Sequence, residues 1–127
     1  MTENEISGKI VDSAYRIHTS LGPGLLESVY EATLALELDQ TGLRFARQKA
    51  IPVIYAQQRL EMGFRADLIV EDAVIVEIKS IDVISPVHKK VLLTYLRLTD
   101  KRVGLPLNFN VNLIKDGITR IVNGFVG

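Results

Sequence analysis

The segment that most constrains the fold of this 127-residue chain covers residues 63–80. It reads GFRADLIVEDAVIVEIKS, in which two apolar runs are separated by the acidic turn at residues 71–73. Short runs of branched apolar residues on either side of a turn predict a β-hairpin. A three-residue loop at this turn pairs Val70 with Val74, and that register determines every other pair in the hairpin.

The predicted register brings three charged side chains together. It places Asp67 directly opposite Glu77, and opposed residues have Cβ atoms about 4.5–5.5 Å apart. Because side chains alternate along a strand, Lys79 shares the face of Glu77 and Ile75, whereas the opposite face carries Val74, Val76 and Ile78. Two carboxylates at this distance repel each other and raise one pKa. A divalent cation removes the repulsion, and hard oxygen ligands suit Mg²⁺ or Mn²⁺.

Ordinary ion pairs are the alternative explanation of the same residues. Asp67 and Glu77 can each pair with a basic neighbour such as Arg65 or Lys79 on a solvated sheet face. The spacing D-x9-E-x-K is a weak pattern by itself, because each of these residue types is common in proteins. The rest of the chain must therefore decide between a metal site and surface ion pairs.

Composition limits the class of protein. The chain has 15 basic and 15 acidic residues, so its net charge gives no support to nucleic-acid binding, and any basic surface must be local. It has no cysteine, which excludes disulfides and thiolate metal sites and fits a reducing compartment. The N-terminus has no apolar signal core, and no apolar run is long enough to span a membrane. We expect a single domain over residues 1–127, located in the cytoplasm, with no membrane segment.

Hydrophobic periodicity and turn residues predict a mixed α/β sheet flanked by helices. Asn4 is a plausible N-cap for the first helix, and Ser85-Pro86 opens the third. Pro52 suggests an edge strand or a bulge. Besides the hairpin, we expect helices over residues 4–20, 25–40 and 86–99, and strands over residues 43–49, 50–56, 102–109 and 118–122.

The helices carry further candidate residues. In the second helix, Glu27, Tyr30 and Glu31 share a face. Taken alone, a first-turn glutamate favoured by the helix dipole and a core-edge aromatic are the commoner explanations of Glu27 and Tyr30. His88, Lys89 and Lys90 lie in the first turns of the third helix, where such residues are usually on the surface. The apolar sides are expected at Leu26, Val29, Thr33 and Leu36 in the second helix and at Val91, Leu92, Tyr95, Leu96 and Leu98 in the third.

Two short motifs resemble a known family. Gly24, Glu27 and Tyr30 in GLLESVY match the G-x-x-E-x-x-Y signature of the GxxExxY proteins. Asp67 with Glu77-Ile78-Lys79 matches the D…(D/E)-x-K core of the PD-(D/E)XK nuclease superfamily, in which that family is placed. The resemblance covers nearly the whole chain. It implies a restriction-endonuclease-like core, with a central mixed sheet flanked by helices.

The resemblance also implies roles for individual residues. Glu27, Asp67 and Glu77 resemble metal ligands, joined by the main-chain carbonyl of Ile78, and Mg²⁺ or Mn²⁺ is the implied cofactor. Lys79 resembles the residue that activates the attacking water and stabilises charge on the phosphate. Further residues that the resemblance or their position places near substrate or behind the ligands are His18, Tyr30, His88, Lys89, Lys90 and Tyr95.

One departure from the pattern leaves the function open. Related nucleases commonly carry a glutamine in the third helix, four residues before a tyrosine, and here Val91 stands four residues before Tyr95. The first hypothesis is a metal-dependent nuclease that hydrolyses DNA or RNA, with DNA favoured. The second is a nuclease-fold module that binds nucleic acid or protein with little catalysis. Either function is compatible with a homodimer or a partner protein, because so small a domain has no obvious second element for holding a duplex.

Overall fold

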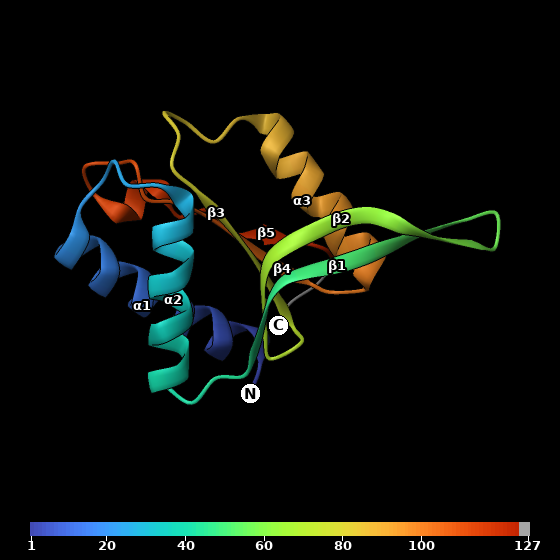
Figure 1. Ribbon diagram of the computed structural model, residues 1–127, viewed down its shortest axis with the longest axis horizontal. Helices are drawn as coiled ribbons and strands as arrows, with labels where there is room; N and C mark the ends of the chain where they lie inside the picture. Colours follow the sequence, from blue (N-terminus) through green and yellow to red (C-terminus); the bar gives the residue numbers. More distant parts are fainter. Residues whose placement is uncertain (125–127) are drawn as a thin grey trace.

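A mixed five-stranded sheet forms the centre of the molecule (Figure 1). The computed structural model describes residues 1–124, apart from the side chain of Met62. The strands are β1 Phe45–Tyr55, β2 Gln58–Val70, β3 Val74–Lys79, β4 Val103–Asn108 and β5 Ile121–Val122. They lie side by side in chain order. The β3–β4 pair is parallel and the other pairs are antiparallel, which confirms the predicted mixed sheet.

Helices cover both faces of this sheet (Figure 1). The helices are α1 Glu3–Leu21, α2 Glu27–Gln40 and α3 Pro86–Thr99, followed by the 3-10 helix η1 Ile114–Gly117. Side chains of α1 and α2 share one buried cluster with Val74, Val76 and Ile78 of β3. Leu92 and Leu96 of α3 share a second cluster with Ile75. The helix α3 forms the crossover that a parallel β3–β4 pair requires.

The predicted hairpin register is confirmed. Val70 pairs with Val74, and Leu68 pairs with Val76. The two buried clusters also confirm the predicted alternation, because Ile75 faces α3 whereas its neighbours Val74 and Val76 face α1 and α2. A buried face on each side of the strand specifies this register strongly, since a slip of one residue would exchange the two sets.

The predicted strands over residues 43–49 and 50–56 are in fact the single strand β1, so that prediction was wrong. Pro52 does not interrupt the strand, because β1 lies at the edge of the sheet, where a missing N–H is tolerated. The pairing with β2 is irregular there, with a register shift between Ile51 and Val53. The long β1–β2 hairpin projects from the body as an arm (Figure 1), and Ile54 and Tyr55 near its tip are 66% and 69% exposed.

The predicted apolar side of α2 was also wrong. Leu26, Val29 and Leu36 are exposed, whereas the buried positions are Tyr30, Glu31, Leu34, Ala35 and Leu38. Apolar residues occur around the whole circumference of this helix, so periodicity does not select one face. In α3, Leu92 and Leu96 are buried as predicted, but Val91 and Leu98 at the margins of the stripe are exposed.

Several element ends differ from the predictions. Helix α1 is capped by Thr2, rather than Asn4, through a capping box with Glu5. Helix α3 is capped by Ser85 as predicted. The last strand contains only Ile121–Val122, because Ile118 contributes an isolated bridge to Leu107 instead of continuing the ladder.

Candidate active site

The hairpin register brings Asp67 and Glu77 together. The last regular pair of the β2–β3 ladder is Leu68 with Val76. Asp67, which precedes Leu68, therefore lies opposite Glu77, which follows Val76. Asp67 then uses its side chain to continue the connection between the strands, since its Oδ2 accepts a 2.7 Å hydrogen bond from the main-chain N–H of Ile78. This bond holds one carboxylate of the predicted pair in a defined position.

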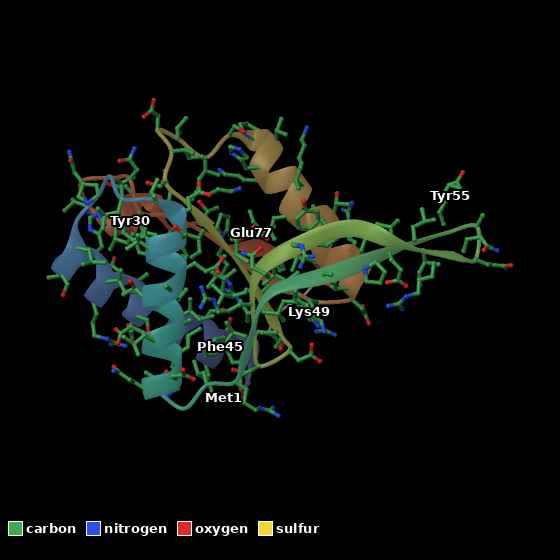
Figure 2. The ribbon with its side chains drawn as sticks, viewed as in Figure 1. Met1, Tyr30, Phe45, Lys49, Tyr55 and Glu77 are labelled. Carbon is green, nitrogen blue, oxygen red and sulfur yellow. The ribbon has the colours of Figure 1, made fainter. Side chains whose placement is uncertain are left out.

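Glu77 and Lys79 line a small cavity of about 110 Å³ between the sheet and α3. The Oε1 atom of Glu77 is buried and has no hydrogen-bond partner among the residues that the structure describes. Figure 2 labels Glu77 near the base of the projecting arm. The residues that line the cavity are Arg65, Glu77, Lys79, His88, Val91, Leu92, Tyr95 and Pro106.

The electrostatics of this cavity are those of a carboxylate short of positive charge. The pKa of Glu77 is raised from 4.5 to about 8, first by burial and then by the negative charge of Asp67, while the positive charge of Lys79 opposes the change. Burial and the charge of Glu77 also raise the pKa of Tyr95. Among the described residues, neither Asp67 nor Glu77 takes part in a salt bridge. The surface ion-pair interpretation therefore loses its support.

Glu27 is held at the end of β3 rather than beside the other two carboxylates. It is the first residue of α2, and its Oε2 accepts a 3.1 Å hydrogen bond from the main-chain N–H of Ser80. The hydroxyl of Ser80 donates to the carbonyl of Leu25 at 2.7 Å. These two contacts attach Ser80, the residue that follows Lys79, to the first residue of α2 and to the loop before it. Glu27 lines a separate hollow with Ser80 and Asn110.

Tyr30 supports the same loop from inside the core. Its side chain is fully buried and stacks on Phe109, with ring centroids 4.4 Å apart. Its hydroxyl donates to the carbonyl of Gly22 at 2.6 Å and accepts from the N–H of Leu25 at 3.1 Å. Between them, Gly24 has a φ of 92°, which favours glycine. The G-x-x-E-x-x-Y residues thus form a clamp on the end of β3.

The other predicted site residues divide into two groups. Tyr95 lines the cavity and stacks on Phe64, with ring centroids 3.4 Å apart. His88 lines the cavity and accepts a hydrogen bond from the N–H of Ser85 through Nδ1. His18 is not among the residues that line the cavity, and its Nε2 is bonded to the carbonyl of Val111 at 2.8 Å. Lys89 and Lys90 are exposed on α3 and do not line the cavity either.

The structure adds residues that sequence analysis did not select. Gln48 donates from its amide nitrogen to Asp67 Oδ1 at 3.3 Å and to Glu31 Oε1 at 2.6 Å. Arg65, considered only as a surface charge, lines the cavity. A buried glutamate and a glutamine have no motif of their own, so the only available signal was the predicted proximity of Glu31 to the helix face of Glu27.

The donor set can be tested for its fit to a divalent cation. Among the described residues, no group of three histidine, cysteine, aspartate or glutamate side chains lies close enough together to hold a metal ion. Two adjacent carboxylates, one with a buried oxygen that has no partner, do fit Mg²⁺ or Mn²⁺. Mg²⁺ is usually bound by one or two carboxylates together with water and substrate phosphates, so a complete protein cage is not required.

Comparison with known proteins gives a match to one protein family. Within the described residues, no helix is long and apolar enough to cross a membrane. A family model described as PD-(D/E)XK nuclease superfamily matches residues 4–121, which is nearly the whole chain. Neither the curated proteins nor the solved structures contain a match. The matching residues include both hairpin strands, the clamp and the crossover helix, and the chain therefore belongs to the PD-(D/E)XK nuclease superfamily.

Proposed function

We propose that the protein is a metal-dependent nuclease that hydrolyses phosphodiester bonds in DNA or RNA. The observation that carries the proposal is the position of Asp67 beside Glu77, whose buried Oε1 has no hydrogen-bond partner among the described residues and which lines a cavity together with Lys79. Such a carboxylate is costly to ionise unless a cation approaches it. Membership of the superfamily supports nuclease chemistry. It also supports a divalent cofactor, because the nucleases of this superfamily generally depend on a divalent metal.

In this proposal, Asp67 and Glu77 hold Mg²⁺ or Mn²⁺ together with the main-chain carbonyl of Ile78. The resemblance implies Glu27 as an additional acidic ligand, but its bond to the N–H of Ser80 holds it apart from these two carboxylates, so we do not assign it to the cation. When bound, the cation lowers the pKa of a bound water and neutralises charge on the phosphate. The hydrogen bond from Ile78 to Asp67 orients the carboxylate before any ligand arrives.

Lys79 is the residue that we assign to the reacting phosphate. The oxygen of the attacking water forms a bond to phosphorus while the bond from phosphorus to the leaving sugar oxygen breaks. The attacking water gives up one proton to solvent, and the leaving oxygen takes up one proton from solvent. Negative charge grows on the phosphate oxygens during this step. The Lys79 ammonium donates a hydrogen bond to the charge that develops and helps to orient the water. The clamp formed by Glu27 and Tyr30 supports this role by holding the chain that follows Lys79.

Basic side chains on α3 and β2 extend the proposed substrate surface. Arg65 and His88 line the cavity, and Lys89 and Lys90 follow His88 on an exposed turn of α3. Phosphates next to the cleaved bond are the natural partners of these groups. We favour DNA over RNA as the substrate, and a homodimer or a partner protein as the means of holding a duplex.

The test is Mn²⁺-dependent cleavage of labelled single-stranded DNA, duplex DNA and RNA. Wild type is compared with Asp67→Ala and Lys79→Ala, and with the matched control substitutions Asp116→Ala and Lys115→Ala in η1. We expect the two site variants to lose cleavage while the two controls retain it, with all four proteins folded by circular dichroism. Equal cleavage by wild type and both site variants would refute the assignment.

Val91 favours a second candidate, a nuclease-fold module that binds nucleic acid or protein with little catalysis. It lines the cavity at the position where the resemblance places a glutamine, so the cavity has an apolar wall in place of an amide. Val91→Gln decides between the two functions, because Val91 is 41% exposed and the fold accommodates the polar side chain. A wild type that binds Mn²⁺ but cleaves nothing, and that cleaves once Val91 is glutamine, identifies the binding module.

A further inference from the structure

Gln48 has an unusual main-chain conformation in the middle of β1. Its φ is 49°, in the left-handed region that residues with a side chain rarely adopt. The register is the same on both sides of it, because Arg47 pairs with Leu68 and Lys49 pairs with Ala66. No residue is inserted, so Gln48 lies opposite Asp67. A strained backbone that persists inside a regular ladder must be held there by the contacts around it.

The side-chain amide of Gln48 joins two carboxylates. Its nitrogen donates to Glu31 Oε1 at 2.6 Å and to Asp67 Oδ1 at 3.3 Å. The orientation of the amide follows from chemistry, since a carboxylate accepts hydrogen bonds and only the nitrogen end can donate them. One hydrogen serves each carboxylate. Because Ile78 donates to Asp67 Oδ2, both oxygens of Asp67 are held from opposite sides.

Glu31, which accepts from Gln48, is itself held in a fixed position. It is 8% exposed, and its second oxygen accepts from Arg47 at 3.0 Å and 3.2 Å. The carbonyl of Gln48 in turn accepts from Arg65 at 3.0 Å, and Arg65 lines the same cavity as Glu77 and Lys79. Gln48 is therefore held at both its side chain and its main chain, by groups that come from α2 and β2.

We propose that Gln48 is a positioning residue that orients Asp67 for cation binding, and that its strained backbone is retained for this purpose. The inference deepens the proposed function, on which it rests for the identity of the ligand. Arg47, Glu31, Gln48 and Asp67 form a continuous chain of hydrogen bonds from the buried face of α2 to the site. Groups behind metal ligands of this kind commonly change metal affinity about 10–100-fold when they are removed.

The experiment compares Gln48→Gly, Gln48→Ala and wild type. Both variants lose the amide, but only glycine relieves the left-handed conformation. Gln57→Gly is a matched control, because Gln57 is also a glutamine with a positive φ, of 66°, but lies at the turn of the arm. Mn²⁺ affinity is measured by electron paramagnetic resonance, and thermal stability is measured without metal.

A second measurement needs no metal. Hydrogen exchange of the Ile78 amide reports directly on its bond to Asp67, and Val76 in the same strand serves as the internal reference. If Gln48 orients Asp67, Ile78 exchanges at least about tenfold faster, relative to Val76, in both Gln48 variants. A residue that only stabilises the fold would change the two amides together.

We expect both Gln48 variants to bind Mn²⁺ about tenfold more weakly or worse. The melting temperature of Gln48→Gly should be no lower than that of Gln48→Ala. The control Gln57→Gly should leave both the Mn²⁺ affinity and the exchange rate of the Ile78 amide unchanged. The inference would be overturned if the Ile78 amide exchanged at the wild-type rate in the Gln48 variants. It would also be overturned if these variants bound Mn²⁺ as tightly as wild type does. If wild type itself binds no Mn²⁺, the proposed function fails, and the exchange of Ile78 alone then decides whether Gln48 positions Asp67.

Discussion

Glu27 accepts a hydrogen bond from the main-chain N–H of Ser80, although the two residues are 53 positions apart in the sequence. This contact fastens the first turn of α2 to the end of β3, directly after Lys79. It gives the glutamate of the G-x-x-E-x-x-Y motif a structural task, whatever else it binds. The tyrosine of the motif supports the same loop from the core, so motif and site are mechanically connected.

Removing the Tyr30 hydroxyl tests this connection. Tyr30→Phe keeps the ring that stacks on Phe109 but leaves the carbonyl of Gly22 and the N–H of Leu25 without their partner. We expect a loss of about 1–2 kcal/mol in the free energy of unfolding, measured with urea. Tyr15→Phe is the control, because Tyr15 is 44% exposed, and it should leave the free energy unchanged. Equal effects of the two substitutions would contradict a clamp role for Tyr30.

The raised pKa of Glu77 predicts how stability depends on pH. In the folded protein this pKa is about 8 instead of 4.5, so between these values the folded state keeps a proton that the unfolded chain releases. Metal-free wild type should therefore lose stability as the pH rises through this range, by up to roughly 1.4 kcal/mol for each pH unit. The stabilisation by the retained proton on Glu77 is complete below pH 4.5 and is lost above about pH 8.

Glu77→Gln isolates this effect, because glutamine has a similar shape and no proton to lose. Urea unfolding across the range, in the presence of a chelator, should give a flatter profile for the variant. The variant should be the more stable protein at the alkaline end, and the difference should shrink toward the acidic end. Parallel profiles for wild type and variant would show that Glu77 does not titrate as the buried position requires.

The arm predicts a contrast between its tip and its base. Ile54 and Tyr55 are exposed and belong to neither buried cluster, whereas Ile51 is 6% exposed and packs with the residues of α3 (Figure 2 labels Tyr55). Replacing Ile54 and Tyr55 by threonine should change the free energy of unfolding by less than about 0.5 kcal/mol each. Ile51→Ala should cost about 2–4 kcal/mol. Urea denaturation checks both, and a large loss at the tip would mean that it supports the fold.

Local patterns correctly predicted the register of the hairpin, and with it the positions of Asp67 and Glu77 opposite each other. Each face of β3 is covered by a different set of helices, so the alternation along residues 74–79 had one register consistent with burial. The Ser85 cap is equally local, because a capping side chain bonds an N–H three residues away. Neither prediction depended on a distant part of the chain.

Predictions that needed distant partners were incomplete or wrong. The buried face of α2 depends on what α1 and the sheet present to it, and the helix sequence is apolar on several sides. Gln48 carries no sequence signal, because its conformation is stabilised by Glu31, Asp67 and Arg65, which lie 17 or 19 residues away. The division of residues 43–56 into two strands was wrong, because the continuous pairing of β1 with β2 is a tertiary property. The expectation that Pro52 marks an edge strand or a bulge was confirmed, since β1 lies at the sheet edge and its register shifts between Ile51 and Val53.

The sequence by itself determined the strand register that sets Asp67 against Glu77 and places Lys79 on the same face. It could do so because alternation and turn residues act over a few positions. Only the tertiary structure decided that Glu77 is buried against α3, that Glu27 reaches Ser80 instead of joining a three-carboxylate cluster, and that Gln48 reaches Asp67. Burial and long-range hydrogen bonds depend on which elements pack together, and that packing is settled by the whole core at once.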